Sequence, residues 1–216
     1  MDFKILRKQM VKNQLLKRGI KDDRVLSVFL DIPRHEFVAP ELGRSSYEDR
    51  PLPIGSGQTI SQPYMVALMS ELLQVKKHMK VLELGTGSGY QSAILGALAK
   101  EVYSVERLSV LADSAAKTLD SLGIKNVHIK IADGSIGLEE FQPYDAIMVA
   151  AGVPKVPQAL LDQLCDGGRL VIPVGSRFSQ VLICLQKQEG KIVERRSCGC
   201  VFVPLLGKQG WSVDNE

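Results

Sequence analysis

The sequence has no run of 18 or more apolar residues, the length that a membrane-spanning helix needs. Its N-terminal stretch, MDFKILRKQMVKNQ, alternates charged with apolar residues and lacks the continuous apolar centre of a secretory signal peptide. The formal net charge of +3 is too small to indicate a surface for nucleic acid or for a membrane. These absences predict a soluble, cytoplasmic chain that binds neither nucleic acid nor a membrane. We also expect a monomer.

Cysteine and histidine are scarce, and their spacing fits no familiar site. Among the four cysteines only Cys198 and Cys200 lie close together, with no second pair and no histidine at zinc-site spacing. The three histidines, at positions 35, 78 and 128, are isolated from one another. We therefore expect no metal site, surface or packing roles for the histidines, and reduced cysteines, which would suit a reducing compartment.

The composition is that of an ordinary globular protein. The 216 residues are 45% hydrophobic and 24% charged, which argues against disorder and suits one domain with a large core. No repeat, low-complexity tract or linker interrupts the chain. We expect a single domain with a helical N-terminal segment at 1–54, a nucleotide-binding core at 55–185, and C-terminal strands with a tail at 186–216.

The hydrophobic pattern predicts an α/β fold. Apolar residues recur at helical spacing over 3–18 before Gly19, and a second helix is expected from Asp22 or Asp23 to just before Pro33. Beyond residue 80, helical patterns at 91–99, 108–122 and 156–164 alternate with strand patterns at 80–84, 101–106, 126–133, 144–151 and 167–175. This alternation predicts a Rossmann-like, doubly wound and mainly parallel sheet. Strand patterns at 180–188, 191–197 and 200–206 follow without helices and predict antiparallel strands at the end.

A glycine motif follows the first of the core strands. In VLELGTGSGYQSA, glycines 85, 87 and 89 stand where the backbone must turn tightly and approach a ligand. The spacing is not the G-x-G-x-x-G of dinucleotide enzymes, and no G-K-[ST] follows for a triphosphate. Glu83 would repel a pyrophosphate but suits a ligand with an ammonium group. The motif therefore favours S-adenosylmethionine over NAD.

Two further acidic positions fall at strand ends. Glu106 ends the second core strand, where the two oxygens of a carboxylate can accept hydrogen bonds from ribose hydroxyls. Asp133 and Gly134 end the third strand, where a side chain and a bare backbone N–H could contact an adenine edge. The alternatives are a surface salt bridge between Glu106 and Arg107, and a turn-forming role for Asp133.

The segment GSGQTISQPYMVALM at 55–69 contains no Lys, Arg, His, Asp, Glu or Cys. It begins as a polar loop, which we expect to be flexible, and continues past Pro63 into a helical pattern. Ser61 is a candidate active-site hydroxyl, and the alternative is a helix cap just before a proline, a role compatible with the first.

Over nearly its whole length the chain resembles the protein-L-isoaspartate O-methyltransferase family. The resemblance rests on MVKNQLLKRGIKDDRVL, IPRHEFV, PIGSGQTISQPYMVALM, VLELGTGSGYQSA, YSVER, ADG, YDAIMVAAG, GGRLVIPVG and VFVPLLG. The glycine motif is common to many methyltransferases, whereas the QTIS-Q-P segment and the VFVPL run are characteristic of this family.

The resemblance implies a function and a set of site residues. The family transfers a methyl group from S-adenosylmethionine, leaving S-adenosylhomocysteine, to the free carboxylate of L-isoaspartyl and D-aspartyl residues in damaged proteins and peptides, which starts their repair. The resemblance implies that Ser61 is the catalytic hydroxyl. It also implies that the cofactor pocket is lined by Glu83, Gly85, Gly87, Gly89, Glu106, Asp133 and Gly134. Substrate contacts are expected from Gln58, Thr59, Ile60, Val203, Pro204 and Leu205.

The absence of an acid or base from the segment 55–69 is consistent with methyl transfer to a carboxylate. A free α-type carboxylate has a pKa of ~3.5 and is already ionised near pH 7, so it can attack a sulfonium methyl without a base. We expect Ser61 to orient this carboxylate and the loop at 55–62 to close over both ligands. Competing readings are a methyltransferase for a small molecule or RNA, a binding module without catalysis, and an NAD-dependent reductase. The low aromatic content of 6% disfavours RNA, the intact acids disfavour a degenerate binding module, and the glycine spacing disfavours NAD.

Overall fold

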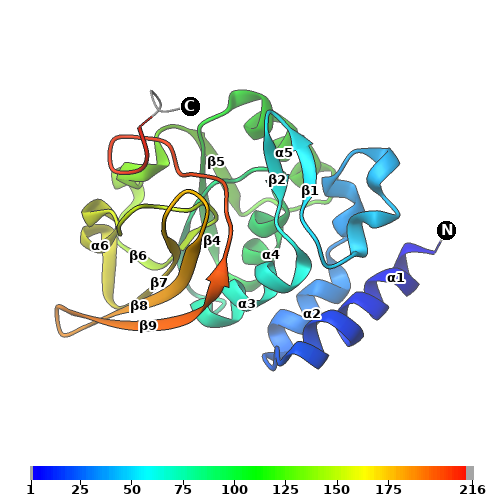
Figure 1. The fold of residues 1–216 in the computed structure, drawn as a ribbon, viewed down its shortest axis with the longest axis horizontal. Helices are drawn as coiled ribbons and strands as arrows, with labels where there is room; N and C mark the ends of the chain where they lie inside the picture. Colours follow the sequence, from blue (N-terminus) through cyan, green and yellow to red (C-terminus); the bar gives the residue numbers. More distant parts are fainter. Residues whose placement is uncertain (1, 213–216) are drawn as a thin grey trace.

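The computed structural model describes residues 2–212, so the last four residues of the expected tail lie outside the described part. A seven-stranded sheet in the order β5-β4-β3-β6-β7-β8-β9 forms the centre of the chain (Figure 1). Its strands are β3 Lys80–Leu84, β4 Glu101–Glu106, β5 Val127–Ile131, β6 Tyr144–Val149, β7 Leu164–Gly175, β8 Gln180–Gln188 and β9 Lys191–Cys200. The strands β3 to β7 pair in parallel, and β8 and β9 pair antiparallel at the end, as predicted.

The chain reverses its winding direction at β3. From β3 the chain continues outward through β4 and β5, then returns to place β6 on the other side of β3. In a doubly wound sheet this switch point opens a crevice beyond the carboxyl ends of the two central strands, where ligands bind. The crevice is therefore bordered by the turn after Leu84 and the turn after Val149.

Helices cover both faces of the parallel strands. They are α3 Pro63–Leu73, α4 Tyr90–Leu98, α5 Ser109–Ser121 and α6 Gln158–Gln163. Alternate residues of β3 face opposite sides: Val81 packs in a core with the N-terminal helices, α3 and α4, whereas Leu82 packs in a second core with Leu160 of α6. Both faces of the central strands are thus buried, which explains their continuous apolar runs.

The N-terminal segment is helical, as predicted, and lies at one side of the sheet, opposite the projecting turn between β8 and β9 (Figure 1). The first helix comprises α1 Phe3–Met10, a π-helical turn at Val11–Leu15 and a 3-10 turn at Leu16–Arg18. It ends at Gly19, whose φ of 94° is a left-handed cap that favours glycine. The second helix is α2 Asp23–Asp31, capped by the side chain of Asp22, which accepts a hydrogen bond from the Arg24 nitrogen.

Two segments differ from the sequence predictions. The segment at 52–60 forms an antiparallel hairpin of β1 Leu52–Gly55 and β2 Gln58–Ile60, where we had expected a loop. Its two-residue tip holds Ser56 and Gly57 at positive φ, the geometry that closes a tight hairpin. The predicted strand at 200–206 is wrong as a third antiparallel strand, because β9 ends at Cys200 and the chain leaves the sheet.

Candidate active site

The glycine motif forms the turn between β3 and α4. Gly85, Gly87 and Gly89 all have positive φ, at 91°, 52° and 86°. A Cβ added to Gly89 would also come within 3.1 Å of the Ala115 Cβ on α5, so the glycine allows the turn to pack closely. The motif therefore presents bare backbone at the switch point of the sheet, as its sequence predicted.

Glu106 fixes this glycine loop. Its Oε2 accepts a hydrogen bond from the Gly87 nitrogen at 2.9 Å, and its Oε1 accepts from the nitrogens of Arg107 and Leu108 at 2.8 and 3.0 Å. The side chain is 8% exposed and makes no salt bridge with the Arg107 side chain among the described residues. Since a carboxylate has about four acceptor positions, three backbone bonds leave one on Oε2 for a ligand hydroxyl.

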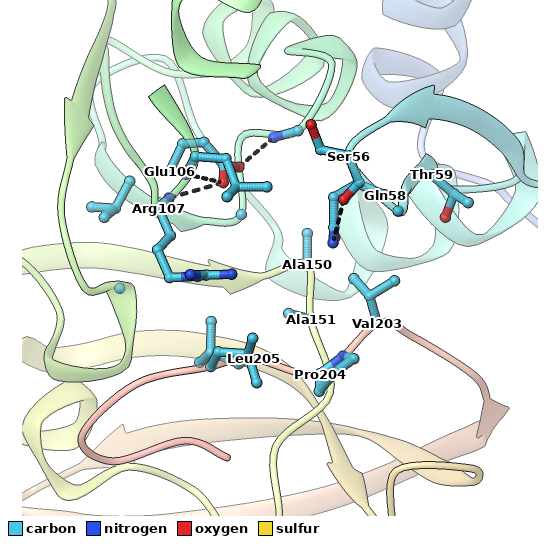
Figure 2. Close-up of a pocket in the computed structure, with 17 residues that line it drawn as sticks. Ser56, Gln58, Thr59, Glu106, Arg107, Ala150, Ala151, Val203, Pro204 and Leu205 are labelled. Atoms are coloured by element: carbon cyan, nitrogen blue, oxygen red, sulfur yellow. Dashed lines mark hydrogen bonds between the residues drawn. The ribbon is translucent and has the colours of Figure 1, made fainter. Parts of the chain in front are cut away.

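A cavity of about 540 Å³ opens above the glycine loop, and we call it the glycine-loop cavity. Figure 2 shows three parts of the chain around it. They are the end of β4 with Glu106, the β1–β2 hairpin with Thr59, and the C-terminal segment with Pro204. Of the predicted cofactor residues, its lining includes Gly85, Gly87, Glu106 and Gly134. Of the predicted substrate residues, it includes Gln58, Thr59, Val203, Pro204 and Leu205.

Several lining residues were missed in the sequence. They are Val105, Arg107, Leu108, Ala150, Ala151 and Leu206, whereas Ser56 and Gly57 belong to the loop at 55–62 that is expected to close over both ligands. Most of them stand at or just past the ends of β4 and β6. The rule that ligands bind beyond the carboxyl ends of parallel strands could have identified them from the strand predictions.

Glu83 lies beneath the glycine loop and outside the described lining of its cavity. The side chain is fully buried, and its Oε2 accepts hydrogen bonds from the hydroxyls of Ser92 and Ser104 at 2.5 and 2.6 Å. Its Oε1 has no partner among the described residues. Burial raises the pKa of Glu83 to about 7, although the two serine hydroxyls oppose this shift. Direct contact between Glu83 and an ammonium group stays a prediction.

Asp133 has a different contact from the one expected. Its Oδ2 accepts a hydrogen bond from the backbone nitrogen of Lys208 at 2.9 Å, and its Oδ1 accepts from the nitrogen and hydroxyl of Ser135. Burial alone would raise the pKa of Asp133, but these hydrogen bonds hold it below the usual value. Asp133 thus caps the turn after β5 and holds the C-terminal segment, while only Gly134 lines the cavity. An adenine contact by Asp133 stays a prediction.

The VFVPL run lies against the turn after β6. The Gly152 nitrogen donates to the Val203 carbonyl at 2.8 Å, and the Leu205 nitrogen donates to the Gly152 carbonyl at 2.9 Å. Trp211 folds back over this segment and donates its indole Nε1–H to the same Gly152 carbonyl at 3.1 Å. Among the described residues, the Val203 nitrogen donates no hydrogen bond and the Pro204 carbonyl accepts none.

Ser61 lies between two spaces. On one side, Ser61, Gly85 and Gly87 line a small cavity of about 40 Å³, whose lining also includes the predicted substrate residue Ile60. On the other side, Ser61 lines a groove of about 780 Å³ between α3 and the C-terminal segment, which we call the Ser61 groove. Ser61 precedes the first helical residue, Pro63, but its side chain makes no capping hydrogen bond to α3 among the described residues.

The glycine-loop cavity and the Ser61 groove share a wall. Thr59, Ala150, Val203 and Pro204 line both spaces. No Asp, Glu or His occurs in the described lining of the groove, whereas Arg18 and Arg177 do. A negatively charged group in the groove would therefore meet no carboxylate, and the shared wall is uncharged.

The remaining candidates take no part in these spaces. His35 stacks on the Phe3 ring at 3.9 Å, and His128 pairs with Glu101 at the surface, which confirms a packing and a surface role. All four cysteines are free thiols, and Cys184 is buried in β8 as predicted. Within residues 2–212 no cluster of three or more His, Cys, Asp or Glu could hold a metal ion. Among the same residues no helix has the length and apolarity to cross a membrane.

Comparison with known proteins identifies the family. The sequence model for "Protein-L-isoaspartate(D-aspartate) O-methyltransferase (PCMT)" matches residues 6–210. A protein-L-isoaspartate O-methyltransferase of Geobacter metallireducens is 55% identical over 99% of this chain and 100% of its own length. One of Methanoculleus marisnigri is 52% identical over 95% of this chain and 93% of its own length.

Solved structures agree with this assignment. A protein-L-isoaspartate O-methyltransferase superposes with a TM-score of 0.84 at 33% identity, covering 94% of this chain and 67% of that one. A Plasmodium falciparum structure described as a putative member, in complex with S-adenosyl-L-homocysteine, gives a TM-score of 0.81 at 28% identity, covering 93% and 98%. Fold, site geometry and sequence thus lead to one assignment. The chain belongs to the protein-L-isoaspartate(D-aspartate) O-methyltransferase family.

Proposed function

We propose that the chain transfers a methyl group from S-adenosylmethionine to the free carboxylate of L-isoaspartyl and D-aspartyl residues in damaged proteins and peptides, which begins their repair. The observation that carries this proposal is the position of Ser61. It lies in one small cavity with Gly85 and Gly87 and at the same time opens onto a groove with no carboxylate in its described lining. A cofactor at the glycine loop and a substrate carboxylate at Ser61 would therefore be neighbours.

The residues of the glycine-loop cavity fit the cofactor. A volume of about 540 Å³ is within the range of small-molecule sites, which is about 300–1,000 Å³. Bare backbone at Gly85, Gly87 and Gly134 allows close approach, and the free acceptor position on Glu106 suits a ribose hydroxyl. The unpartnered Oε1 of buried Glu83, just before the loop, offers an acceptor that a cationic ligand would hold in its ionised form. When bound, S-adenosylmethionine supplies an electrophilic methyl group on a sulfonium.

The Ser61 hydroxyl has the properties needed to orient a carboxylate. It can donate one hydrogen bond to one carboxylate oxygen and leave the other oxygen free to attack the methyl group. The negative charge of the carboxylate disappears as the ester forms, so a neutral donor stabilises the reactant less than a lysine ammonium would. Positioning of this kind contributes up to about 7–11 kcal/mol when the geometry is good.

The C-terminal segment offers a binding edge for the substrate backbone. Among the described residues, no group pairs with the Val203 nitrogen or with the Pro204 carbonyl. Both residues line the Ser61 groove. An extended peptide can pair with such an edge in the manner of an added strand, which would recognise backbone rather than a particular side chain. This mode suits an enzyme whose substrates share only the damaged residue.

The assay uses labelled S-adenosylmethionine with matched isoaspartyl and normal aspartyl peptides, and scores base-labile methyl ester. Label on the isoaspartyl peptide alone supports the proposal, and a D-aspartyl peptide tests its second substrate. Equal label on both peptides, or none on either, would contradict it.

We further propose that the whole chain, 1–216, acts as one domain and as a cytoplasmic monomer. The four free thiols support a reducing compartment. Light scattering of the purified chain and fractionation of cells would measure the mass and the location.

A further inference from the structure

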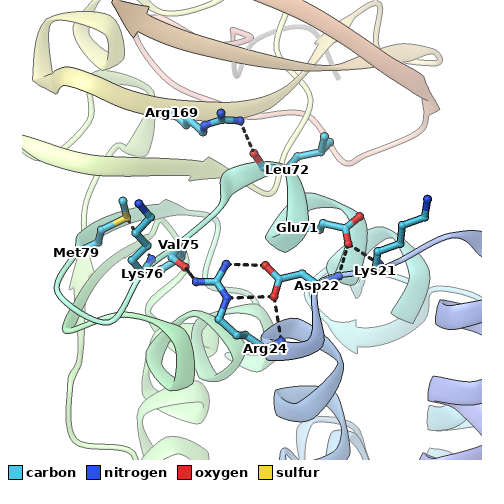
Figure 3. Close-up of polar contacts among 9 residues, drawn as sticks. All are labelled: Lys21, Asp22, Arg24, Glu71, Leu72, Val75, Lys76, Met79 and Arg169. Carbon is cyan, nitrogen blue, oxygen red and sulfur yellow. Dashed lines mark hydrogen bonds and ion pairs between the residues drawn. The ribbon is translucent and has the colours of Figure 1, made fainter.

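The N-terminal segment holds the C-terminal end of α3. Oε1 of Glu71 accepts hydrogen bonds from the backbone nitrogens of Lys21 and Asp22 at 2.6 and 2.7 Å. Arg24, whose guanidinium is paired with Asp22, donates to the Val75 carbonyl at 2.9 Å just beyond the helix (Figure 3). The start of the second helix is thereby attached to the end of the third.

The same segment also holds the chain before α3, through Arg34. Its Nη2 donates to the Ser61 carbonyl at 2.7 Å, and its Nε donates to the Ser46 carbonyl at 2.6 Å. One guanidinium therefore bridges a 3-10 turn of the N-terminal segment and the residue that lines both spaces of the site. The planar fork of arginine can reach two carbonyls in fixed directions, which the single ammonium of lysine does less well.

Arg34 occupies an unusual environment for a charged side chain. It is fully buried, and it forms no ion pair with the described carboxylates. Its third nitrogen, Nη1, has no hydrogen-bond partner among the described residues, and its guanidinium lies 4.8 Å from the centre of the Tyr90 ring. Burial lowers the pKa of Arg34 to about 10, so the side chain remains charged at neutral pH. Burying an unpaired cation is costly for stability.

Two contacts, one with the Tyr90 ring and one with the Ser61 carbonyl, connect Arg34 to the reaction site. Tyr90 is the first residue of α4 and directly follows Gly89 of the glycine loop. Tyr90 and Ser61 line the same small cavity. Arg34 thus contacts the two elements whose relative placement sets the distance between substrate carboxylate and cofactor.

We propose that Arg34 is a positioning residue for methyl transfer: through the Ser61 carbonyl it fixes the peptide plane after Ser61, and so the direction of the Ser61 hydroxyl relative to the glycine loop. This inference rests on the proposed function, because it assumes that the Ser61 hydroxyl orients the substrate. It assigns to Arg34 a part in the reaction without any contact with substrate.

The test compares Arg34→Lys with Arg24→Lys as a matched control. Both remove a guanidinium that donates to a backbone carbonyl at an end of α3, but only Arg34 acts next to Ser61. For Arg34→Lys we expect kcat for an isoaspartyl peptide to fall roughly 10- to 100-fold, with unchanged affinity for S-adenosylhomocysteine, because small misplacement of a reacting group has effects of this size. For Arg24→Lys we expect wild-type kcat. Equal kcat losses in the two variants, or none in Arg34→Lys, would overturn the proposal.

A double-mutant cycle separates positioning from general structural damage. If Arg34 acts through Ser61, then Arg34→Lys lowers kcat much less in a Ser61→Ala background than in the wild type. Additive losses would mean that Arg34 acts elsewhere.

A measurement on the unaltered chain keeps the proposal falsifiable if the variant does not fold. In protein labelled with ¹⁵N-arginine, the Nε–H of Arg34 should exchange slowly with water and shift when isoaspartyl peptide is added. Fast exchange or no shift would overturn the proposal. Failure of the proposed function would be seen separately, as wild-type protein that binds S-adenosylhomocysteine but labels no isoaspartyl peptide.

Discussion

Glu106 at the end of β4 accepts the backbone N–H of Gly87 at 2.9 Å, so the second strand of the parallel sheet holds the turn that follows the first. The carboxylate that was expected only to bind a ligand also shapes the loop that surrounds it. We therefore predict that cofactor affinity and loop geometry depend on the same side chain.

Replacement of Glu106 by Gln should weaken cofactor binding. An amide group presents an N–H to at least one of the three backbone donors, which leaves that donor unpaired. The expected cost is about 1–3 kcal/mol, or roughly 5- to 150-fold in the dissociation constant of S-adenosylhomocysteine. Isothermal titration calorimetry would measure it. Glu101→Gln, at the exposed start of the same strand, is the control, and equal affinities for the two variants would refute this role of Glu106.

Removal of the Ser61 hydroxyl should affect turnover and leave the cofactor affinity intact. In Ser61→Ala the substrate carboxylate loses its donor, and kcat should fall roughly 10- to 100-fold. Steady-state assays with an isoaspartyl peptide give kcat, and calorimetry gives the affinity for S-adenosylhomocysteine. Ser121→Ala removes an exposed hydroxyl at the end of α5, away from both spaces, and should retain wild-type kcat. An undiminished kcat in Ser61→Ala would remove this serine from the mechanism.

Burial of Glu83 should make the stability of the ligand-free chain depend on pH. Its pKa rises from 4.5 to about 7 on folding, so between these values the folded chain binds more protons than the unfolded chain. The free energy of unfolding therefore falls as the pH rises through this window, by at most about 3 kcal/mol, and levels off above it. Urea unfolding at several pH values would show this slope in the wild type.

The Glu83→Gln variant isolates this contribution. Because Gln cannot ionise, its pH slope over the window should be shallower than that of the wild type. Glu194→Gln, on the exposed strand β9, should keep the wild-type slope. Parallel stability curves for all three proteins would show that Glu83 does not titrate in this range.

Loss of the Asp133 carboxylate should loosen the C-terminal segment. In Asp133→Asn the hydrogen bond from the Lys208 nitrogen weakens, and a bond to a charged group contributes about 1.5–3 kcal/mol. We expect faster amide hydrogen exchange at 203–209 and a rise of about fivefold in KM for peptide, since the binding edge at Val203 and Pro204 becomes less ordered. Exposed Asp162→Asn is the control. Unchanged exchange over 203–209 would contradict this role for Asp133.

Much of the fold follows from local pattern. The strands from Lys80 to Gly175 were each located within a few residues. Most are apolar runs with both faces buried, whereas the edge strand β5 is only partly buried. The glycine motif and Glu106 could be placed at the site because the rule for parallel sheets brings the ends of consecutive strands together.

The parts that could not be predicted depend on contacts between distant residues. Asp133 resembled a ligand-binding acid, but its partner Lys208 lies 75 residues away in sequence. Arg34 sits in IPRHEFV with no local sign that it would be buried against Ser61. The run 200–206 has the composition of a strand, yet its hydrogen bonds go to the loop at Gly152, and composition alone does not choose between those partners.

The wall shared by the two spaces has a consequence for inhibition by the spent cofactor. Thr59, Ala150, Val203 and Pro204 line both the glycine-loop cavity and the Ser61 groove. A cofactor in the cavity and a peptide in the groove would therefore meet at this wall without either occupying the space of the other. Spent cofactor can then inhibit by competing with fresh cofactor while leaving peptide binding open. Such an enzyme would slow as S-adenosylhomocysteine accumulates relative to S-adenosylmethionine, even when peptide is saturating.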